Sequence, residues 1–369
     1  LYFNRLPRST PIAQPENHGT PGRQNSTAEE NIGPTYADFG HSPVVPDENE
    51  AVTVSVVAQD PDNVTGLDLW YSVEAGDWVS TEMNSVGGGE YRGMIPGQEA
   101  GATVQFYVEG TDSNSVTSTY PRRGRDSRAL YKVDDGLAAD GGLHNFRLVL
   151  HPDDARMLHE TIELMSNDMV PATMIYNESE VFYEASVRLS GSQRARPFQP
   201  RCSFRIGFNA DHLFRGVHNG ITLDRSESTG FGQREHLYHH GMNHVGGLPT
   251  EYNDLFNIIT PQQQHTGSAE AQLARYSDVF LDEQYENGSD GQLYEYELTY
   301  FPQQTVDRDP ESRKVPNPDG VAGTPIRYLG DDQEHFRWAF LNKNNRVEND
   351  YSQLMEFTRV FGQSGDKFN

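Results

Sequence analysis

Short runs in which apolar and polar residues alternate constrain the fold of this chain more than any other feature. Residues 52–58, 67–71 and 104–108 each carry an apolar side chain at every second position. Successive side chains of a strand point to opposite faces, so each run predicts a strand with one buried face. Turn-forming segments such as GGG at 87–89 separate the runs. Strands of this length and spacing predict a β-sandwich over residues 34–134.

Residues 135–369 combine strand and helix patterns, which predicts an α+β unit. We expect strands at 145–150, 171–176, 181–189, 255–259, 272–276 and 293–300, and helices at 152–165, 232–245 and 351–361. On the last helix, Leu354, Phe357, Thr358 and Phe361 are expected on one side. Residues 1–33 are rich in Pro, Asn, Gly and Glu, which predicts a linker or the end of a preceding domain. The predicted fold class is therefore multidomain, with an all-β sandwich followed by an α+β domain.

The charge of the chain excludes one class of partner. Its 54 acidic and 29 basic residues give a formal net charge of -25, and only Lys132, Lys314, Lys343 and Lys367 are lysines. A strongly acidic surface repels phosphate backbones, so we expect no nucleic-acid partner. It also suits high ionic strength, where salt screens the repulsion among the carboxylates. No apolar run approaches the ~20 residues that span a bilayer, so no transmembrane segment is expected.

The segment from Val187 to Phe214 has the pattern of a phosphate-handling element. Two alternating runs flank a loop rich in Ser, Gly, Gln and Arg, which includes Ser192. A glycine-bearing loop between two strands, followed by a basic residue, covers and anchors phosphates in kinase-like N-lobes. Ser192, Arg201 and Arg205 are therefore the candidate cofactor-binding residues. The alternative is that these arginines have a structural or surface role.

The same segment resembles the spore-coat-H (CotH) kinase family. Two further pieces carry the resemblance: Arg234-Glu235-His236-Leu237 through Gly247-Leu248-Pro249, and Phe280-Leu281 through Gly291-Gln292-Leu293-Tyr294-Glu295. The resemblance implies a kinase-like N-lobe that would hold ATP with Mg²⁺ or Mn²⁺ in a longer parent protein. The family has a lysine where this chain has Arg201, and arginine is not an equivalent phosphate anchor. The family's catalytic carboxylates follow a helix like that at 351–361, so we expect the chain to be catalytically incomplete.

Two more resemblances place the chain in a larger protein. The segment from His18 to Ser26 resembles the exit of a lamin-tail domain, and the pattern from Tyr91 to Pro96 resembles bacterial fibronectin-III or Ig-like modules. Such arrangements imply a secreted or cell-surface bacterial protein. Its expected partners are other surface or envelope proteins, another fragment of the same polypeptide, or a second copy. The alternative function is thus a structural or adhesive component with a degenerate CotH-like domain.

Two sets of residues are candidate metal ligands. His236, His240 and His244 are spaced four residues apart on a predicted helix, which places three imidazoles on one face, as a zinc or copper site needs. Asp60 and Asp62 lie in an acidic loop that offers the oxygen ligands of a Ca²⁺ site. The alternatives are an exposed polar helix for the histidines and ordinary turn chemistry for the aspartates. Cys202, the single cysteine, is expected to pack as a small apolar residue.

Overall fold

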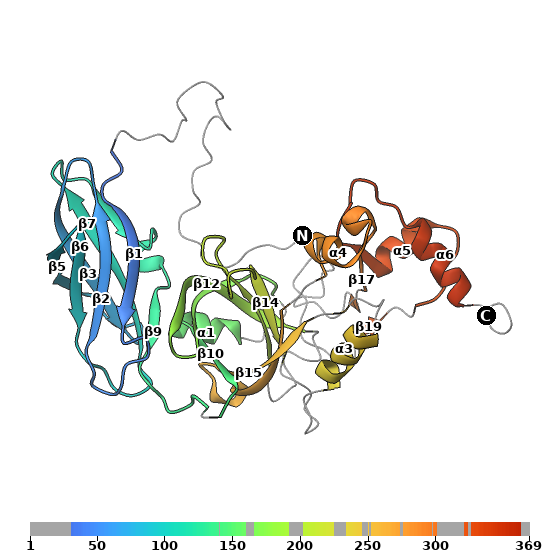
Figure 1. The fold of residues 1–369 in the computed structure, drawn as a ribbon, viewed down its shortest axis with the longest axis horizontal. Coiled ribbons are helices and arrows are strands. Elements are labelled where there is room, and N and C mark those ends of the chain that lie inside the picture. Colours follow the sequence, from blue (N-terminus) through green and yellow to red (C-terminus); the bar gives the residue numbers. More distant parts are fainter. Residues whose placement is uncertain are drawn as a thin grey trace.

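Three units lie in a row in the computed structural model of the chain (Figure 1). A β-sandwich stands at one end, a β-barrel lies in the centre, and a group of short helices and strands forms the other end. The structure describes residues 31–139, 141–159, 166–191, 202–224, 234–245, 250, 252–273, 276–296, 298–300, 321–323 and 326–362. Within these residues no helix is long and apolar enough to cross a membrane.

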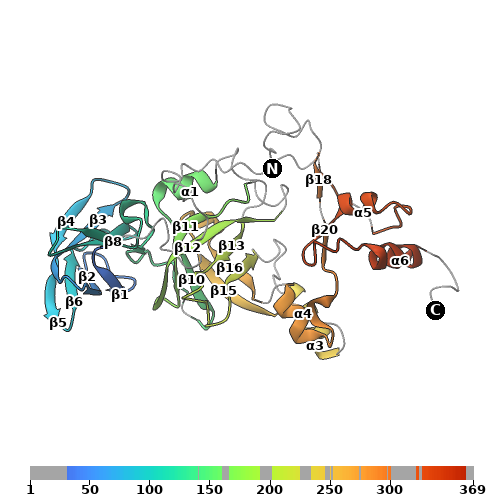
Figure 2. The same ribbon diagram turned by 90° about the horizontal axis from the view of Figure 1, so that it is seen from above.

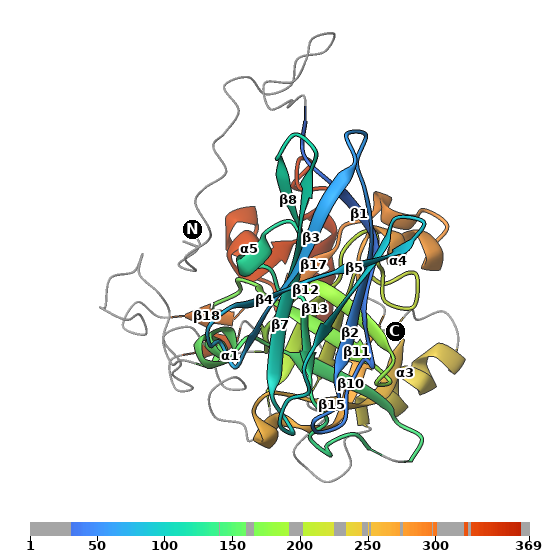
Figure 3. The same cartoon turned by 90° about the vertical axis from the view of Figure 1, so that its left-hand side faces the viewer.

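The first unit consists of two antiparallel sheets, as the alternating runs predicted. One sheet has the order β1 (Thr35–Ser42), β2 (Val52–Gln59), β6 (Glu90–Ile95), β5 (Asn84–Gly87). The other has the order β4 (Val79–Glu82), β3 (Val64–Val73), β7 (Thr103–Asp112), β8 (Thr117–Tyr120), and β9 (Leu130–Lys132) also pairs with β7. Figure 3 views this unit from its outer side. The alternate residues of β2, Val52, Val54, Val56 and Ala58, are all buried between the sheets.

The second unit is a closed barrel of seven strands. Its order is β10 (His144–Val149), β11 (Val170–Tyr176), β12 (Glu180–Ser190), β13 (Ser203–Gly207), β14 (Gly220–Asp224), β16 (Gly267–Gln272), β15 (Asn253–Ile259), and β15 closes onto β10 in parallel. The remaining pairs are antiparallel. Aromatic and aliphatic side chains such as Phe146, Phe204 and Phe256 fill the interior. The helix α1 (Pro152–Leu158) packs beside β11, as Figure 2 shows.

Most strands of the barrel follow the sequence patterns, but one prediction was wrong. The strand expected at 272–276 lies instead at β16, and only Gln272 falls in both ranges. β16 has the sequence GSAEAQ, whose small residues Ala269 and Ala271 face the barrel core. Small side chains give a weak hydrophobic signal, so the pairing of β16 with β14 and β15 decides its position. The helix expected at 152–165 is confirmed as far as Leu158, and residues 160–165 lie outside the described part.

The third unit contains short elements. The helices are α3 (Arg234–Val245), α4 (Asp278–Gln284), α5 (Gln333–Ala339) and α6 (Ser352–Phe361), and two small sheets pair β17 (Tyr294–Tyr296) with β20 (Phe340–Asn342) and β18 (Leu298–Tyr300) with β19 (Val321–Gly323). Thus the run expected as one strand at 293–300 contains β17 and β18, which pair with different partners. The core around Phe336, Phe340 and Tyr351 holds α5, β20 and α6 together.

The predicted face of α6 was partly wrong. Leu354 packs against this core and Thr358 is fully buried, as expected. Phe357 and Phe361, however, are about half exposed, at 53% and 49%, and stack on each other. Met355 takes the inward place instead. Successive residues of an α-helix lie 100° apart around its axis. The spacing of the apolar residues therefore locates the buried face of the helix only to within about one residue on either side.

Candidate functional sites

Arg205, the candidate phosphate anchor that the structure describes, is held inside the wall of the barrel. Only 8% of the residue is exposed. Its Nη1 donates a hydrogen bond of 3.0 Å to Oγ1 of Thr222, which faces it on β14. The guanidinium also lies over Gly220, where an added Cβ would come within 2.8 Å of Nη2. These contacts give Arg205 a structural role between β13 and β14, and phosphate binding by this residue stays a prediction.

The other two candidates of the phosphate element, Ser192 and Arg201, lie outside the described residues. The strands that flank them are well defined. β12 and β13 pair as neighbours, and the pairing closes with Ser190 opposite Ser203. The expected strand–loop–strand arrangement is therefore confirmed for the strands of this hairpin.

The acidic loop after β2 gains a third carboxylate that sequence reasoning missed. Oxygen atoms of Asp60, Asp62 and Asp112 all lie within 4.8 Å of one another. Asp112 ends β7, and the pairing of Val64 with Asp112 brings this strand end beside the loop. The segment TDSNS at 111–115 reads as a turn in the sequence, and only strand register shows that its aspartate belongs with Asp60 and Asp62.

Protein donors already meet much of the charge of this acidic cluster. Oδ1 of Asp112 accepts backbone N–H bonds of 2.8 Å from Asn114 and Val116, and Asn31 donates its side-chain amide to Oδ2. Desolvation raises the pKa of Asp112, but these hydrogen bonds outweigh it and hold the pKa below its usual value. Oδ1 of Asp60 accepts a bond of 2.7 Å from the backbone of Asp62. Ordinary turn chemistry thus accounts for these contacts, and calcium binding stays a prediction.

The three histidines of the second metal prediction do lie on one helix, α3, but do not converge. His240 and His244 have ring centroids 4.1 Å apart, and Nδ1 of His244 donates to the carbonyl oxygen of His240. His236 is half-buried. Among the described residues, these three are not one of the groups whose ligating atoms lie within 4.8 Å. The neighbouring His239, not predicted, contacts Asn253 of β15 through Nδ1.

A joint between the sandwich and the barrel was not predicted at all. Leu130 of β9, Val149 of β10 and Ile175 of β11 form one buried cluster, against which Val44, Val45 and Val181 pack. Tyr183 projects from β12 of the barrel into the sandwich core, where its ring contacts Phe39 and Phe106 with centroids 5.3 Å and 5.9 Å away. The two β units therefore share apolar interior.

Polar groups of the joint are paired as well. His41 donates from Nε2 to the carbonyl oxygen of Val44 (2.9 Å) and accepts at Nδ1 from the hydroxyl of Tyr183. Burial lowers the pKa of His41 to about 4, so the ring is neutral at pH 7. Arg128 donates from Nε to Asp154 of α1 at 2.6 Å, with both side chains mostly buried. Arg123 pairs with Glu184 at 2.8 Å.

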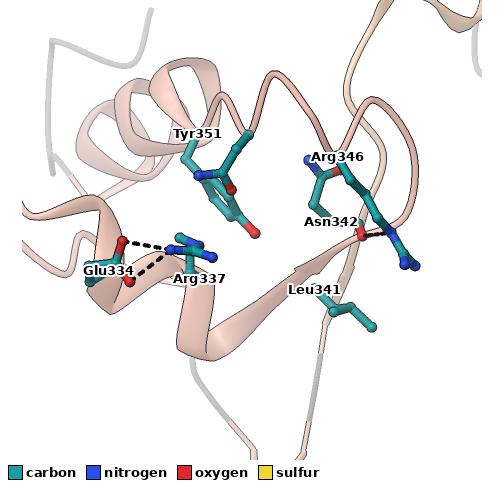
Figure 4. A pocket seen from close by; sticks show the side chains of 7 residues that line it. Glu334, Arg337, Leu341, Asn342, Arg346 and Tyr351 are labelled. Carbon is teal, nitrogen blue, oxygen red and sulfur yellow. Dashed lines mark hydrogen bonds and ion pairs between the residues drawn. The ribbon is translucent and has the colours of Figure 1, made fainter.

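A pocket of about 390 Å³ lies beside α5, β20 and the start of α6 (Figure 4). Arg337 and Arg346 line it together with Glu334 and Tyr351. Both carboxylate oxygens of Glu334 accept from Nη1 of Arg337, at 2.8 Å and 3.0 Å. Nε of Arg346 donates to the backbone oxygen of Asn342. The carboxylate of Glu334 offsets one of the two positive charges that line the pocket.

Comparisons with known proteins assign no family. No family model matches the sequence, and no curated protein matches it. Solved structures superpose only weakly, as three of the matches show. A Br derivative of BhCBM56 shares 11% identity at a TM-score of 0.19, over 29% of this chain and 96% of its own.

The cycloalternan-forming enzyme from Listeria monocytogenes, in complex with a pentasaccharide substrate, shares 12% identity at a TM-score of 0.21, over 53% of this chain and 16% of its own. The family 64 laminaripentaose-producing β-1,3-glucanase from Paenibacillus barengoltzii, complexed with laminarihexaose, shares 12% identity at 0.16, over 57% and 69%. Superpositions this weak do not establish a common fold.

Proposed function

We propose that this chain is a structural or adhesive part of a secreted or surface-exposed bacterial protein, in which a CotH-like unit serves as architecture. The joint between sandwich and barrel carries the proposal. A linker between independent domains leaves the domains free to move, and small polar interfaces are the default between them. Here the shared apolar cluster and the Tyr183 ring, which packs against the sandwich core, favour one rigid block. A rigid block suits a protein that must hold other surface proteins, or copies of itself, at a set spacing.

The rigidity of the joint is directly measurable. Nitroxide labels at Ser85→Cys on β5 and Asp211→Cys on the barrel report the distance between the two units by double electron–electron resonance. Cys202 is buried and is not expected to take the label. We expect a narrow distance distribution, which broadens in Tyr183→Ala because the variant empties part of the shared core. Tyr238→Ala, on the exposed side of α3, is the control that leaves it narrow. A broad distribution in the labelled parent chain would contradict the proposal.

The second candidate is an N-lobe of a CotH-type atypical kinase that binds ATP with Mg²⁺ or Mn²⁺ in a longer parent. The β12–β13 hairpin favours it, because a loop between paired neighbouring strands is the element that covers phosphates in kinases. Calorimetric titration with ATP and either metal separates the two candidates. The structural proposal expects no binding. Binding that disappears in Arg201→Ala would establish the kinase-like reading instead, and binding lost in Arg205→Ala alone requires a check that the barrel still folds.

A further inference from the structure

Three side chains with metal-ligating atoms converge in the barrel, and none of them belongs to the two predicted metal sites. They are His159, which caps α1, Cys202, which precedes β13, and His265, which lies in the short helical turn between β15 and β16. One ligating atom of each lies within 4.8 Å of the others. They come from three distant parts of the chain, so their meeting is a product of the tertiary fold.

Two of the three side chains are buried, and His159 is half-buried. Cys202 is 2% exposed and His265 is 4% exposed. The rings of His159 and His265 stack with centroids 4.8 Å apart and planes 13° apart. Sγ of Cys202 lies 3.9 Å from Nε2 of His265. Zinc bonds of about 2.3 Å to sulfur and about 2.0–2.1 Å to nitrogen separate neighbouring tetrahedral ligands by about 3.5 Å. The ligating atoms therefore draw together on binding, and the nearly parallel rings rotate so that each nitrogen lone pair points at the ion.

We infer that His159, Cys202 and His265 form a binding site for a zinc-like divalent ion, with a fourth position for water. This inference goes beyond the proposed function and does not depend on it. One thiolate and two imidazoles are typical zinc ligands, whereas calcium and magnesium bind mainly oxygen ligands. The ligand set therefore favours zinc over these two ions. An ion here would tie α1 to two strands of the barrel.

Metal binding changes the hydrogen bonds of His265. Nδ1 accepts from the backbone N–H of Cys202 at 3.2 Å, and Nε2 lies 3.3 Å from the amide nitrogen of Gln264 and 3.9 Å from Sγ. On binding, the thiol releases its proton to solvent and the sulfur bonds the metal. The single proton of the neutral ring then sits on Nδ1, Nε2 bonds the metal, and the contacts with the Cys202 N–H and the Gln264 amide are given up. Two neutral hydrogen bonds are a small loss beside the free energy of a structural zinc site.

Cobalt(II) is the probe that tests this inference, because a cobalt–thiolate bond gives a charge-transfer band in the near ultraviolet. Cys202 is the single cysteine of the chain. Such a band from the chelator-stripped, full-length chain therefore reports this one sulfur, without any variant. We expect a band that saturates at one Co²⁺ per chain and disappears when Zn²⁺ is added. Saturation with Co²⁺ without this band would overturn the inference.

Two variants locate the remaining ligands. Loss of an outer-shell partner weakens metal sites by about 10–100-fold, so His159→Gln, which removes a direct ligand, is expected to weaken Zn²⁺ binding by at least about 100-fold. His240→Gln, on the exposed face of α3, is the matched control and should leave the affinity unchanged. Because His159 is only half-buried, the substitution is expected to leave the fold intact, and circular dichroism of the variant checks this. Unchanged affinity in His159→Gln, or loss in His240→Gln, would contradict the assignment.

Discussion

Burial changes the chemistry of individual side chains around the joint. His41 lies 7% exposed between the sandwich and Tyr183, and both of its ring nitrogens have partners that suit the neutral ring. Arg147 of β10 is fully buried, yet it keeps its charge because Asp135 and Glu178 each accept a bond of 2.8 Å. A histidine or an arginine on the surface would contribute little to stability. Here the interactions of His41 and Arg147 matter more, because little water surrounds these side chains.

The stability of the chain is expected to fall as the pH drops through the range set by His41. The unfolded ring has a pKa near 6.5 and the folded ring near 4, so acid protonates the unfolded chain first. The stabilisation is complete above about pH 6.5 and declines toward pH 4, by about 3 kcal/mol for a shift of this size. Urea unfolding at a series of pH values measures it. In His41→Phe the decline between pH 6.5 and 5 should be shallower than in the parent chain, and equal slopes would contradict the prediction.

Removal of the buried cation should cost far more than removal of an exposed one. Arg147→Met leaves Asp135 and Glu178 without their partner in a mostly buried place, and we expect a loss of about 3 kcal/mol. The control is Arg337→Met, which breaks the exposed pair with Glu334 and should cost less than about 1 kcal/mol. Urea unfolding compares the two. Similar losses in both variants would show that the buried network is not stabilising.

At the scale of elements, strand pairing decides what side-chain patterns leave open. β16 has a weak apolar pattern, but it lies between β14 and β15 in the barrel and pairs with both. These pairings close the barrel and fix the position of β16. Asp112 joins Asp60 because β7 pairs with β3 in one register. In α6, Leu354 and Met355 pack against the small core around Phe336 and Thr358 is buried, whereas Phe357 is about half exposed.

Two glycines in paired strands of the sandwich should respond oppositely to alanine. A Cβ at Gly110 of β7 would come within 2.6 Å of the Tyr36 hydroxyl oxygen and 2.7 Å of Leu67 Cδ1, so Gly110→Ala should cost about 1–3 kcal/mol. A Cβ at Gly66 of β3 meets nothing within 4 Å. Gly66→Ala should therefore be neutral or stabilise slightly, since alanine loses less backbone entropy. Thermal melts of both variants test this, and a neutral Gly110→Ala would show that the sheets separate easily.

At the scale of the whole molecule, charge and the row of units act together. The net charge of -25 means that the excess carboxylates repel one another, while the apolar joint holds the sandwich and the barrel in contact. Residues 34–134 do form a sandwich, but the region from 135 onward separates into a barrel and a smaller unit. The three units lie in a row in Figure 1, and the apolar joint links the first two of them.

Salt should stabilise this acidic body. The Debye length shortens from about 30 Å at 0.01 M salt to about 10 Å at 0.1 M, so carboxylates on different faces no longer repel one another. We expect the melting temperature to rise between these concentrations of sodium chloride. Potassium chloride is the control for a specific effect of sodium and should give the same rise. A melting temperature that falls with either salt would mean that ion pairs outweigh the repulsion.

The sequence by itself determined strands β2, β3 and β7 of the sandwich, most barrel strands, the helices at α3 and α6 and the acidic character, because period and composition are local properties of the chain. Only the tertiary structure decided that Arg205 is buried against Thr222, that Asp112 joins Asp60, and that Tyr183 enters the sandwich core. It also decided that Cys202 meets His159 and His265. Each of these depends on strand register and barrel closure, which bring together residues far apart in the chain, and one sequence carries no direct record of such contacts.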